Sequence, residues 1–328
     1  MARIDELFRY LKDQGGSDLH LLASRVPRVR IDGRLTDVQD WKPLSDEEIR
    51  SLLREISTPE QWQQYESSGD LDFAYGLEGV ARFRVNFLNQ HQGAAAVFRI
   101  IPEKILTLSD LNMPKAIRDL ANLEQGLVLV TGPTGSGKST TLAAVINEIN
   151  EKSSKHIVTI EDPVEFVHPN KKCVLSQREV GSDTASFGDA LRVAIRQDAD
   201  VILVGEMRDL ETIELAITAA EMGTLVFGTL HTSSATKTID RLIDAFPASQ
   251  QSQVRCQIAA SLLAVLNQRL MKRHDKVGQV VAAEFLVATD AVRSLIREGK
   301  NHQIYSLMET GQQRGMQTMD HALQHLYQ

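Results

Sequence analysis

Cysteine, aromatic residues and long apolar runs are all scarce in this sequence, and each scarcity excludes a class of protein. The 328 residues include two cysteines, Cys173 and Cys256, and no Cys-x-x-Cys pair, so a zinc knuckle is not expected. Aromatic residues make up 5% of the chain, too few for a platform that stacks on single-stranded nucleic acid. No apolar run approaches the ~20 residues of a membrane helix, so we expect no direct insertion into a membrane.

A surplus of positive charge is also missing. The formal net charge is −7, which argues against a protein that coats nucleic acid. The opening segment, MARIDELFRYLKDQGG, is charged and amphipathic, unlike a signal peptide. We therefore expect a cytosolic protein, of two domains by its length, that reaches any membrane through a partner.

The first hundred residues have the pattern of a small α+β domain on an antiparallel sheet. Apolar residues at helical spacing predict a helix over residues 1–14, ended by two glycines. The alternation in SDLHLLASRVPRVRIDGRL predicts a hairpin with a turn at Asp32-Gly33.

Further along this region, the spacing of Ser45 and Glu48 predicts a capping box that opens a second helix. Residues 71–101 have the pattern of three more strands. Residues 102–125, which contain two prolines and show no strand alternation, indicate a linker followed by a first helix.

From Gly126 onward the pattern changes to strands that alternate with helices. Such alternation predicts an α/β fold with helices around a largely parallel sheet. From about residue 285 the chain is expected to be mostly helical. The predicted strands are 127–131, 157–160, 201–204 and 225–228.

A glycine-rich segment, GPTGSGKS, matches the full P-loop pattern between a predicted strand and a predicted helix. Its glycines let backbone N–H groups surround phosphate oxygens at the positive end of the helix dipole. Lys138 is expected to reach the β- and γ-phosphates, and the Ser139 hydroxyl to bind magnesium. The alternative is a protein that binds nucleotide without hydrolysing it. The predicted nucleotide-binding residues are Gly132, Pro133, Thr134, Gly135, Ser136, Gly137, Lys138, Ser139 and Thr140.

Three carboxylates, Glu161, Asp162 and Glu165, follow the predicted strand 157–160. Strand carboxyl ends line the ligand crevice of a parallel sheet. There a carboxylate can bind a magnesium-bound water or accept a proton from the attacking water. The alternative is a solvated acidic turn.

Glu206 follows the strand 201–204, but Gly205 stands where many nucleotide hydrolases have a magnesium-binding aspartate. Magnesium often keeps several water ligands, so Glu206 is expected to act on the metal through water. The alternative is that Glu206 only caps the helix that starts near Asp209.

His231 lies just past the strand 225–228, where it could sense the γ-phosphate, although a lone histidine is more often structural. Arg82 and Arg84 lie on one face of a predicted strand, near Arg99 in sequence. Arginine suits stabilisation of a phosphoryl transition state from a neighbouring subunit, and ordinary surface charge is the alternative. Residues 289–311 predict two helices, either packed on the core or available for docking.

Together these stretches resemble the secretion-ATPase superfamily, and within it the retraction ATPases of type IV pili. The resemblance covers nearly the whole chain. It implies a PAS-like α+β domain over residues 1–100, a linker over 101–118, a RecA-like P-loop ATPase core over 119–284 and a helical C-terminal region over 285–328. The motifs that carry it are GGSDLHL, ARFRVN, VFRIIP, GLVLVTGPTGSGKSTTLAA, HIVTIEDPVEFVH, ILVGEMRDLETIELA, GTLHTSSATKTIDR, AVRSLIREGK and GMQTMD.

The resemblance implies a homohexameric motor that binds ATP and Mg²⁺ between protomers. It further implies pilus retraction, and hence twitching motility, through an inner-membrane platform protein. The chain would then be cytoplasmic and peripheral at the inner membrane through its partners. By the same resemblance Glu165 is the general base or water positioner, and His231 is the His-box histidine. The arginines Arg82, Arg84 and Arg99 match residues that reach the nucleotide across the subunit interface.

The chain departs from the family pattern at a few positions. Thr224 stands where a second histidine is usual, Ala199 where proline is usual, and AVRS replaces AIRN. The Thr224 departure motivates an alternative function, that of a nucleotide-binding accessory or regulatory subunit with weak hydrolysis. The cysteine-rich insertion of the extension and secretion relatives is missing from the sequence, which favours the retraction branch.

Overall fold

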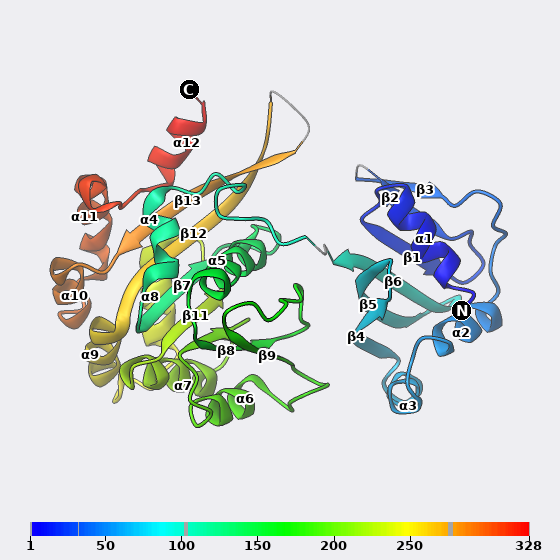
Figure 1. Cartoon of the computed structure of the whole chain (residues 1–328), viewed down its shortest axis with the longest axis horizontal. Coiled ribbons are helices and arrows are strands. Elements are labelled where there is room, and N and C mark those ends of the chain that lie inside the picture. Colours follow the sequence, from blue (N-terminus) through cyan, green and yellow to red (C-terminus); the bar gives the residue numbers. More distant parts are fainter. Residues whose placement is uncertain (1, 32, 102–103, 275–277, 328) are drawn as a thin grey trace. The chain divides into compact units, whose positions relative to one another are not determined.

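Two separate sheets, each with its own buried core, organise the chain. The structure is a computed structural model that describes residues 2–31, 33–101, 104–274 and 278–327. It contains an N-terminal unit, Met1–Lys104, and a C-terminal unit, Ile105–Gln328 (Figure 1). No helix within the described ranges is both long and apolar enough to cross a membrane.

The N-terminal unit is built on a six-stranded antiparallel sheet with the order β3-β2-β1-β6-β5-β4. Its strands are β1 (Asp18–Leu22), β2 (Arg28–Ile31), β3 (Arg34–Asp37), β4 (Asp70–Leu77), β5 (Ala81–Gln90) and β6 (Gly93–Ile101). Its helices are α1 (Asp5–Asp13), α2 (Asp46–Arg54) and α3 (Pro59–Ser68).

One face of this sheet is apolar because alternate residues of its strands are apolar. Along β5, Phe83, Val85 and Phe87 are buried, and the Phe8 ring of α1 stacks on Phe83 with 4.3 Å between centroids. The residues between them must project from the opposite face. The predicted placement of Arg82 and Arg84 on one face of a strand is therefore confirmed.

Most elements predicted for this unit are confirmed. The helix predicted over 1–14 is α1, and Ser45 forms both hydrogen bonds of the predicted capping box with Glu48. The prediction of a two-stranded hairpin was incomplete, because the segment forms three strands, β1, β2 and β3. Its expected turn falls between β2 and β3, where Gly33 is described and Asp32 lies outside the described residues.

The C-terminal unit contains a seven-stranded sheet with the order β13-β12-β7-β11-β10-β8-β9, in which β13 alone is antiparallel to its neighbour. The strands are β7 (Gly126–Thr131), β8 (His156–Glu161), β9 (Val174–Glu179), β10 (Val201–Val204), β11 (Leu225–Leu230), β12 (Leu262–Lys272) and β13 (Gln279–Val287). The predicted α/β fold around a largely parallel sheet is confirmed.

Helices and short 3₁₀ turns surround this sheet. The helices are α4 (Lys115–Arg118), α5 (Lys138–Lys152), α6 (Phe187–Ala194), α7 (Leu210–Glu221), α8 (Ala235–Asp244), α9 (Gln251–Ser261), α10 (Asp290–Arg297), α11 (Ile304–Thr310) and α12 (Met319–Tyr327). The 3₁₀ turns are η1 (Asp119–Asn122), η2 (Asn301–Gln303) and η3 (Gln312–Arg314).

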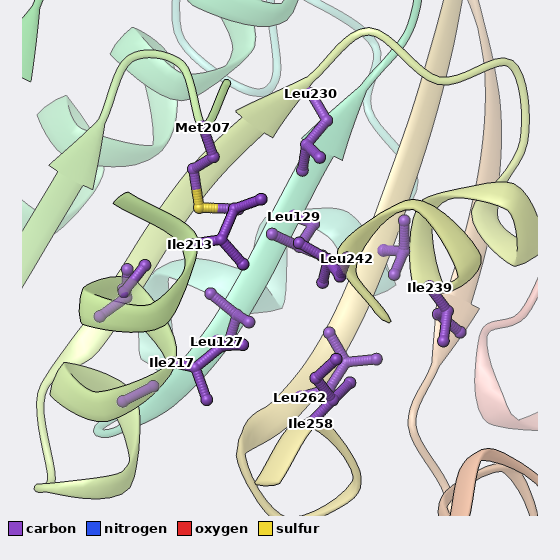
Figure 2. Close-up of a cluster of buried hydrophobic side chains, with 14 of the residues drawn as sticks. Leu127, Leu129, Met207, Ile213, Ile217, Leu230, Ile239, Leu242, Ile258 and Leu262 are labelled. Atoms are coloured by element: carbon purple, nitrogen blue, oxygen red, sulfur yellow. The ribbon is translucent and has the colours of Figure 1, made fainter. Parts of the chain in front are cut away.

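The sheet is covered on both faces, and its central strand shows why. All six residues of β7 are buried, as expected for a parallel strand between two layers. Leu127 and Leu129 pack with residues of α6 to α11, in the cluster that Figure 2 shows. Val128 and Val130 pack on the other side, with α5 and the segment before β7. Since the six strands from β12 to β9 run in parallel, their carboxyl ends meet at one edge, where a ligand site is expected.

Candidate functional site

The P-loop leaves the carboxyl end of β7 and leads into α5. Gly132, Gly135 and Gly137 have φ values of +139°, +76° and +87°, a region that side chains other than glycine rarely adopt. A Cβ on Gly132 would also collide with the Gln268 carbonyl oxygen of β12. The backbone can therefore curl tightly here and direct its N–H groups toward a ligand at the start of α5.

Lys138, the first residue of α5, lies inside this loop with 9% of its surface exposed. Its Nζ donates hydrogen bonds to the carbonyl oxygens of Gly132 at 3.0 Å and Pro133 at 3.2 Å. Burial lowers the pKa of Lys138, and the carboxylates of Glu206 and Glu165 oppose that effect. The fold thus brings these three side chains to the same edge of the sheet, although they come from three different segments.

Glu206 directly follows β10 and is held by two partners. Its Oε2 accepts a hydrogen bond from Arg208 at 2.7 Å, and its Oε1 lies 3.2 Å from His231 Nε2. Burial tends to raise the pKa of Glu206, but Arg208 and His231 outweigh it and hold the pKa below its ordinary value. The alternative that Glu206 caps α7 is wrong, because Asp209 occupies that position and accepts from the Thr212 N–H.

Gly205 has a steric reason to be glycine. Its N–H donates to the Ile160 carbonyl oxygen of β8 at 2.7 Å, which draws the ends of the two strands together. A Cβ at this position would lie 3.0 Å from that oxygen and 3.2 Å from Glu161 Cα. Glu161 Cγ would be 3.6 Å away, so a side chain at position 205 would lie against Glu161.

The acidic turn after β8 is only partly solvated. Glu161 accepts hydrogen bonds from Thr159 Oγ1 at 2.7 Å and Gln177 Nε2 at 3.4 Å, and burial raises its pKa. Glu165 is partly exposed, and its N–H lies 3.4 Å from Glu161 Oε2. Asp162 is exposed, so the alternative of a solvated acidic turn describes that residue and not Glu161.

A cavity of about 420 Å³ opens beside the P-loop. Pockets for small molecules and cofactors have volumes of roughly 300 to 1,000 Å³. The cavity is lined by residues 133–136 of the P-loop, 231–233 after β11, 269–271 of β12 and Gln279 of β13. The contribution of the β12–β13 hairpin was missed by the sequence analysis, because neither strand was predicted.

The residues present fit a nucleotide with a magnesium ion. The Ser136 Oγ is buried in the loop without a hydrogen-bond partner among the described residues, and the loop glycines leave a cradle that side chains would fill. In the part of the chain that the structure describes, no group of three or more His, Cys, Asp or Glu residues could hold a metal by itself. Magnesium bound to phosphates needs only one or two protein ligands, and the Ser139 hydroxyl, with Glu206 acting through water, would supply them.

A second cavity, of about 30 Å³, lies between Ser139, Glu161, Gly205, Thr229 and His168. This volume exceeds the roughly 10 to 15 Å³ that one water requires. The Nδ1 of His168 is buried, with no partner among the described residues. An ordered water at this position would be bound by polar groups of both the P-loop helix and the acidic turn.

His168 gives the site a predicted pH dependence of stability. The ring is 8% exposed, and burial lowers its pKa from 6.5 to about 4. The native state keeps His168 neutral while the unfolded chain takes up a proton below pH 6.5. The contribution of neutral His168 to the free energy of unfolding is therefore fully present above pH 6.5. As the pH falls toward 4, this contribution decreases by about 3 kcal/mol at most. We expect urea denaturation to show a smaller acid loss in His168→Gln than in wild type, whereas the exposed His325→Gln keeps the wild-type slope. Equal slopes in all three proteins would contradict the prediction.

The three predicted arginines belong to the N-terminal unit. Arg99 Nε donates to Asp18 Oδ1 at 2.7 Å across the β1–β6 pair, and Arg84 is exposed opposite Arg99 on β5. Arg30 Nε lies 3.6 Å from the other oxygen of Asp18. Arg30 and Arg99 thus flank the Asp18 carboxylate, and Arg84 lies beside Arg99 on the same face of the sheet.

Thr224 lies away from the P-loop edge. It immediately precedes β11, and its carbonyl oxygen accepts from the N–H of Gly126, the first residue of β7. His231, by contrast, follows the last residue of β11. A six-residue strand spans roughly 20 Å, so a side chain at 224 cannot reach the phosphates in the same protomer.

Comparisons with known proteins place these observations in a family. The profile of the family described as "Type II/IV secretion system protein" matches residues 28–326. The "Type IV pilus retractation ATPase PilT" of Pseudomonas aeruginosa is 51% identical over 323 residues, which cover 98% of this chain and 93% of that protein. The "Twitching motility protein" of Neisseria gonorrhoeae is 51% identical over 305 residues, or 93% of this chain and 81% of its own length.

Solved structures agree with this assignment. The crystal structure of the pilus retraction motor PilT with bound ADP superposes with a TM-score of 0.93 at 46% identity, covering 100% of this chain and 93% of that one. The Legionella pneumophila ATPase DotB superposes with a TM-score of 0.83 at 30% identity, covering 99% and 91%.

Proposed function

Because the chain belongs to the family of type II/IV secretion system proteins, we propose that it is an ATP-hydrolysing motor that powers the retraction of type IV pili. The observation that carries this proposal is the 51% identity over 98% of the chain to a type IV pilus retraction ATPase. The P-loop and the two carboxylates near Lys138 supply the parts that hydrolysis requires.

The P-loop N–H groups and Lys138 would bind the β- and γ-phosphates of ATP. Lys138 Nζ would exchange its bonds with Gly132 and Pro133 for phosphate oxygens, and burial would strengthen that attraction. The Ser139 hydroxyl and, through water, Glu206 would hold Mg²⁺, whose contribution is to neutralise charge on the phosphates. Glu161 lies next to Gly205, since a Cβ at position 205 would be 3.6 Å from Glu161 Cγ.

Glu165 is the proposed general base. It is partly exposed and close enough to Lys138 to influence the pKa of that lysine. Among the described residues, its carboxylate has no side-chain hydrogen bonds like those that hold Glu161 and Glu206. A carboxylate in this position can order the attacking water and accept its proton. His231, in contact with Glu206, would report the state of the γ-phosphate to the loop 231–234.

The assembly and partners are also part of the proposal. We propose that the N-terminal unit is a PAS-like domain and that six protomers form a ring with ATP between subunits. Arg82, Arg84 and Arg99 would then stabilise the phosphoryl transition state from a neighbouring protomer. The ring would act in the cytoplasm on an inner-membrane platform protein. Arg84 and Arg99 face each other across β5 and β6, and this grouping of guanidinium groups on one face of the sheet supports the proposed role of the arginines.

The observation that suggested the alternative, a weakly hydrolysing accessory subunit, does not concern the P-loop end of the sheet. It rested on Thr224, which lies at the opposite end of β11 from His231. Glu165, Glu206, Lys138 and Ser139 are all present as in the proposed machinery.

Deletion of the gene in the organism that encodes it tests the proposed function. We expect cells with many surface pili that no longer move over surfaces, because pili would still be extended but not withdrawn. Complementation with the wild-type gene should restore motility, and complementation with Lys138→Ala should not. Unchanged surface motility in the deletion strain would contradict the proposal.

A further inference from the structure

Two motifs of the C-terminal region remain outside the nucleotide site: AVRSLIREGK at 291–300 and GMQTMD at 315–320. The first forms α10 and the turn that follows it, and the second leads into α12. Both attach to α8, the helix that begins directly after the loop 231–234. Three residues of that loop line the nucleotide cavity, so α8 lies between the cavity and both motifs.

Glu284 of β13 joins α8 to the second motif. It is 4% exposed, and its carboxylate accepts hydrogen bonds from two backbone N–H groups. One belongs to Ala235, the first residue of α8, and the other to Met319, the first residue of α12. Burial raises the pKa of Glu284, and the hydrogen bonds from the two backbone N–H groups oppose that effect. Each helix start is therefore held to the same side chain.

The GMQTMD segment is itself fixed to β13. Phe285 and Gln317 exchange backbone hydrogen bonds of 2.7 and 2.9 Å, and Gln317 Nε2 donates to the Ala283 carbonyl oxygen at 2.9 Å. The start of α12 therefore follows β13, and through Glu284 it also follows the start of α8.

The loop 231–234, which precedes α8, is also attached to β7, the strand that leads into the P-loop. Asn267 of β12 is fully buried and donates 2.9 Å hydrogen bonds to the Thr232 carbonyl oxygen and to Thr131 Oγ1. Thr131 is the last residue before the P-loop, and Thr232 Oγ1 lies 2.6 Å from Thr238 Oγ1 of α8. The loop 231–234 is thus tied both to the P-loop strand and to α8.

A second contact attaches α8 to the first motif. Asn301, 5% exposed and directly after AVRSLIREGK, donates to Asp240 Oδ1 of α8 at 2.7 Å. Ile239 and Leu242 of α8, labelled in Figure 2, belong to a buried cluster. Val292 and Ile296 of α10 belong to the same cluster. Close-packed elements of this kind move as units rather than deforming continuously.

We propose that α8 transmits the movement of the loop 231–234 to the C-terminal helices. In this proposal Glu284 is the positioning residue that joins the start of α8 to the start of α12. The inference rests on the proposed function, since it needs a nucleotide whose phosphates move the loop. A glutamine at 284 has one acceptor oxygen in place of two and carries no negative charge, so it holds the two helix starts more weakly than glutamate does.

Hydrogen exchange of the full-length protein, compared between Mg-ADP and Mg-AMP-PNP, tests the link. In wild type we expect the two nucleotides to change exchange in residues 319–322 by at least about fivefold, the lower end of typical coupling between sites. In Glu284→Gln this difference should disappear, while the nucleotides still protect residues 132–141. Persistence of the difference in Glu284→Gln, or its absence in wild type with the P-loop protected, would overturn the inference alone. If neither nucleotide protects the wild-type P-loop, the proposed function fails and the inference fails with it.

Two further variants keep the test decisive. Glu309→Gln removes an exposed carboxylate from the neighbouring helix α11 and should behave as wild type. In wild type we also expect a nucleotide response in residues 291–300. Asn301→Ala removes the hydrogen bond to Asp240 of α8 but leaves the apolar packing, so it should reduce that response, with P-loop protection retained. This variant decides the question if Glu284→Gln does not fold, because an unchanged response in Asn301→Ala would count against α8 as the connecting element.

Discussion

Lys138→Ala is expected to reduce the rate of ATP hydrolysis by roughly 10²- to 10³-fold, the usual effect of removing one electrostatic contact to a transition state. The Nζ of Lys138 lies within the P-loop, where burial weakens competition from water. It is also a cation close to both Glu165 and Glu206, so its loss removes positive charge that offsets these carboxylates beside the triphosphate. Phosphate release with Mg-ATP measures the rate, and nucleotide titration should show weaker binding as well.

Lys152→Ala is the matched control for this variant. Lys152 lies at the other end of α5 and forms an exposed i,i+4 pair with Glu148, which contributes at most about 1 kcal/mol to stability. We expect the control to hydrolyse ATP at the wild-type rate and both variants to assemble as wild type does. Hydrolysis near the wild-type rate in Lys138→Ala would remove the P-loop from the chemistry.

The elements predicted from the sequence are those whose pattern is local. The strands that became β7, β8, β10 and β11 are short apolar runs bounded by helices, a pattern typical of buried parallel strands. The β12–β13 hairpin was missed because its first strand directly continues α9, without a turn residue to mark the boundary. The strand β9 was missed because its alternation is weak and it lies at the sheet edge.

The site shows the same division between local and non-local information. The P-loop is readable because one short segment contains the turn, the lysine and the hydroxyl. The walls of the cavity come from β12, β13 and the loop after β11, which only the strand order brings together. No spacing rule in the sequence relates Arg269 or Gln279 to Gly132.

The missing aspartate at 205 illustrates what the sequence cannot show. A glycine in this position indicates only that a ligand is lost. The structure adds that β8 and β10 approach so closely that a Cβ at 205 would lie 3.0 Å from the Ile160 oxygen, which leaves little room for a side chain there. Likewise Thr224 is seven residues from His231, but the extended strand between them places the two at opposite edges of the sheet.

Glu165→Gln should separate hydrolysis from binding more cleanly than any other single substitution. Glutamine keeps the size of the side chain but cannot accept a proton, so hydrolysis should fall by roughly 10²- to 10⁴-fold, the usual contribution of a general base. Nucleotide affinity should stay close to wild type, because Glu165 is not among the P-loop groups that bind phosphate. Single-turnover phosphate release and nucleotide titration together measure the two effects.

Asp162→Asn serves as the control, because Asp162 is an exposed carboxylate on the same turn. It should turn over ATP at close to the wild-type rate. Glu206→Gln completes the comparison, since Glu206 is held by Arg208 and His231 and is expected to act on magnesium. Its loss should therefore be relieved in part by raising the Mg²⁺ concentration, whereas the loss in Glu165→Gln should not. If Glu165→Gln turns over normally while Glu206→Gln is inactive at every Mg²⁺ concentration, the base is Glu206, and the acidic turn serves only to support the end of β10.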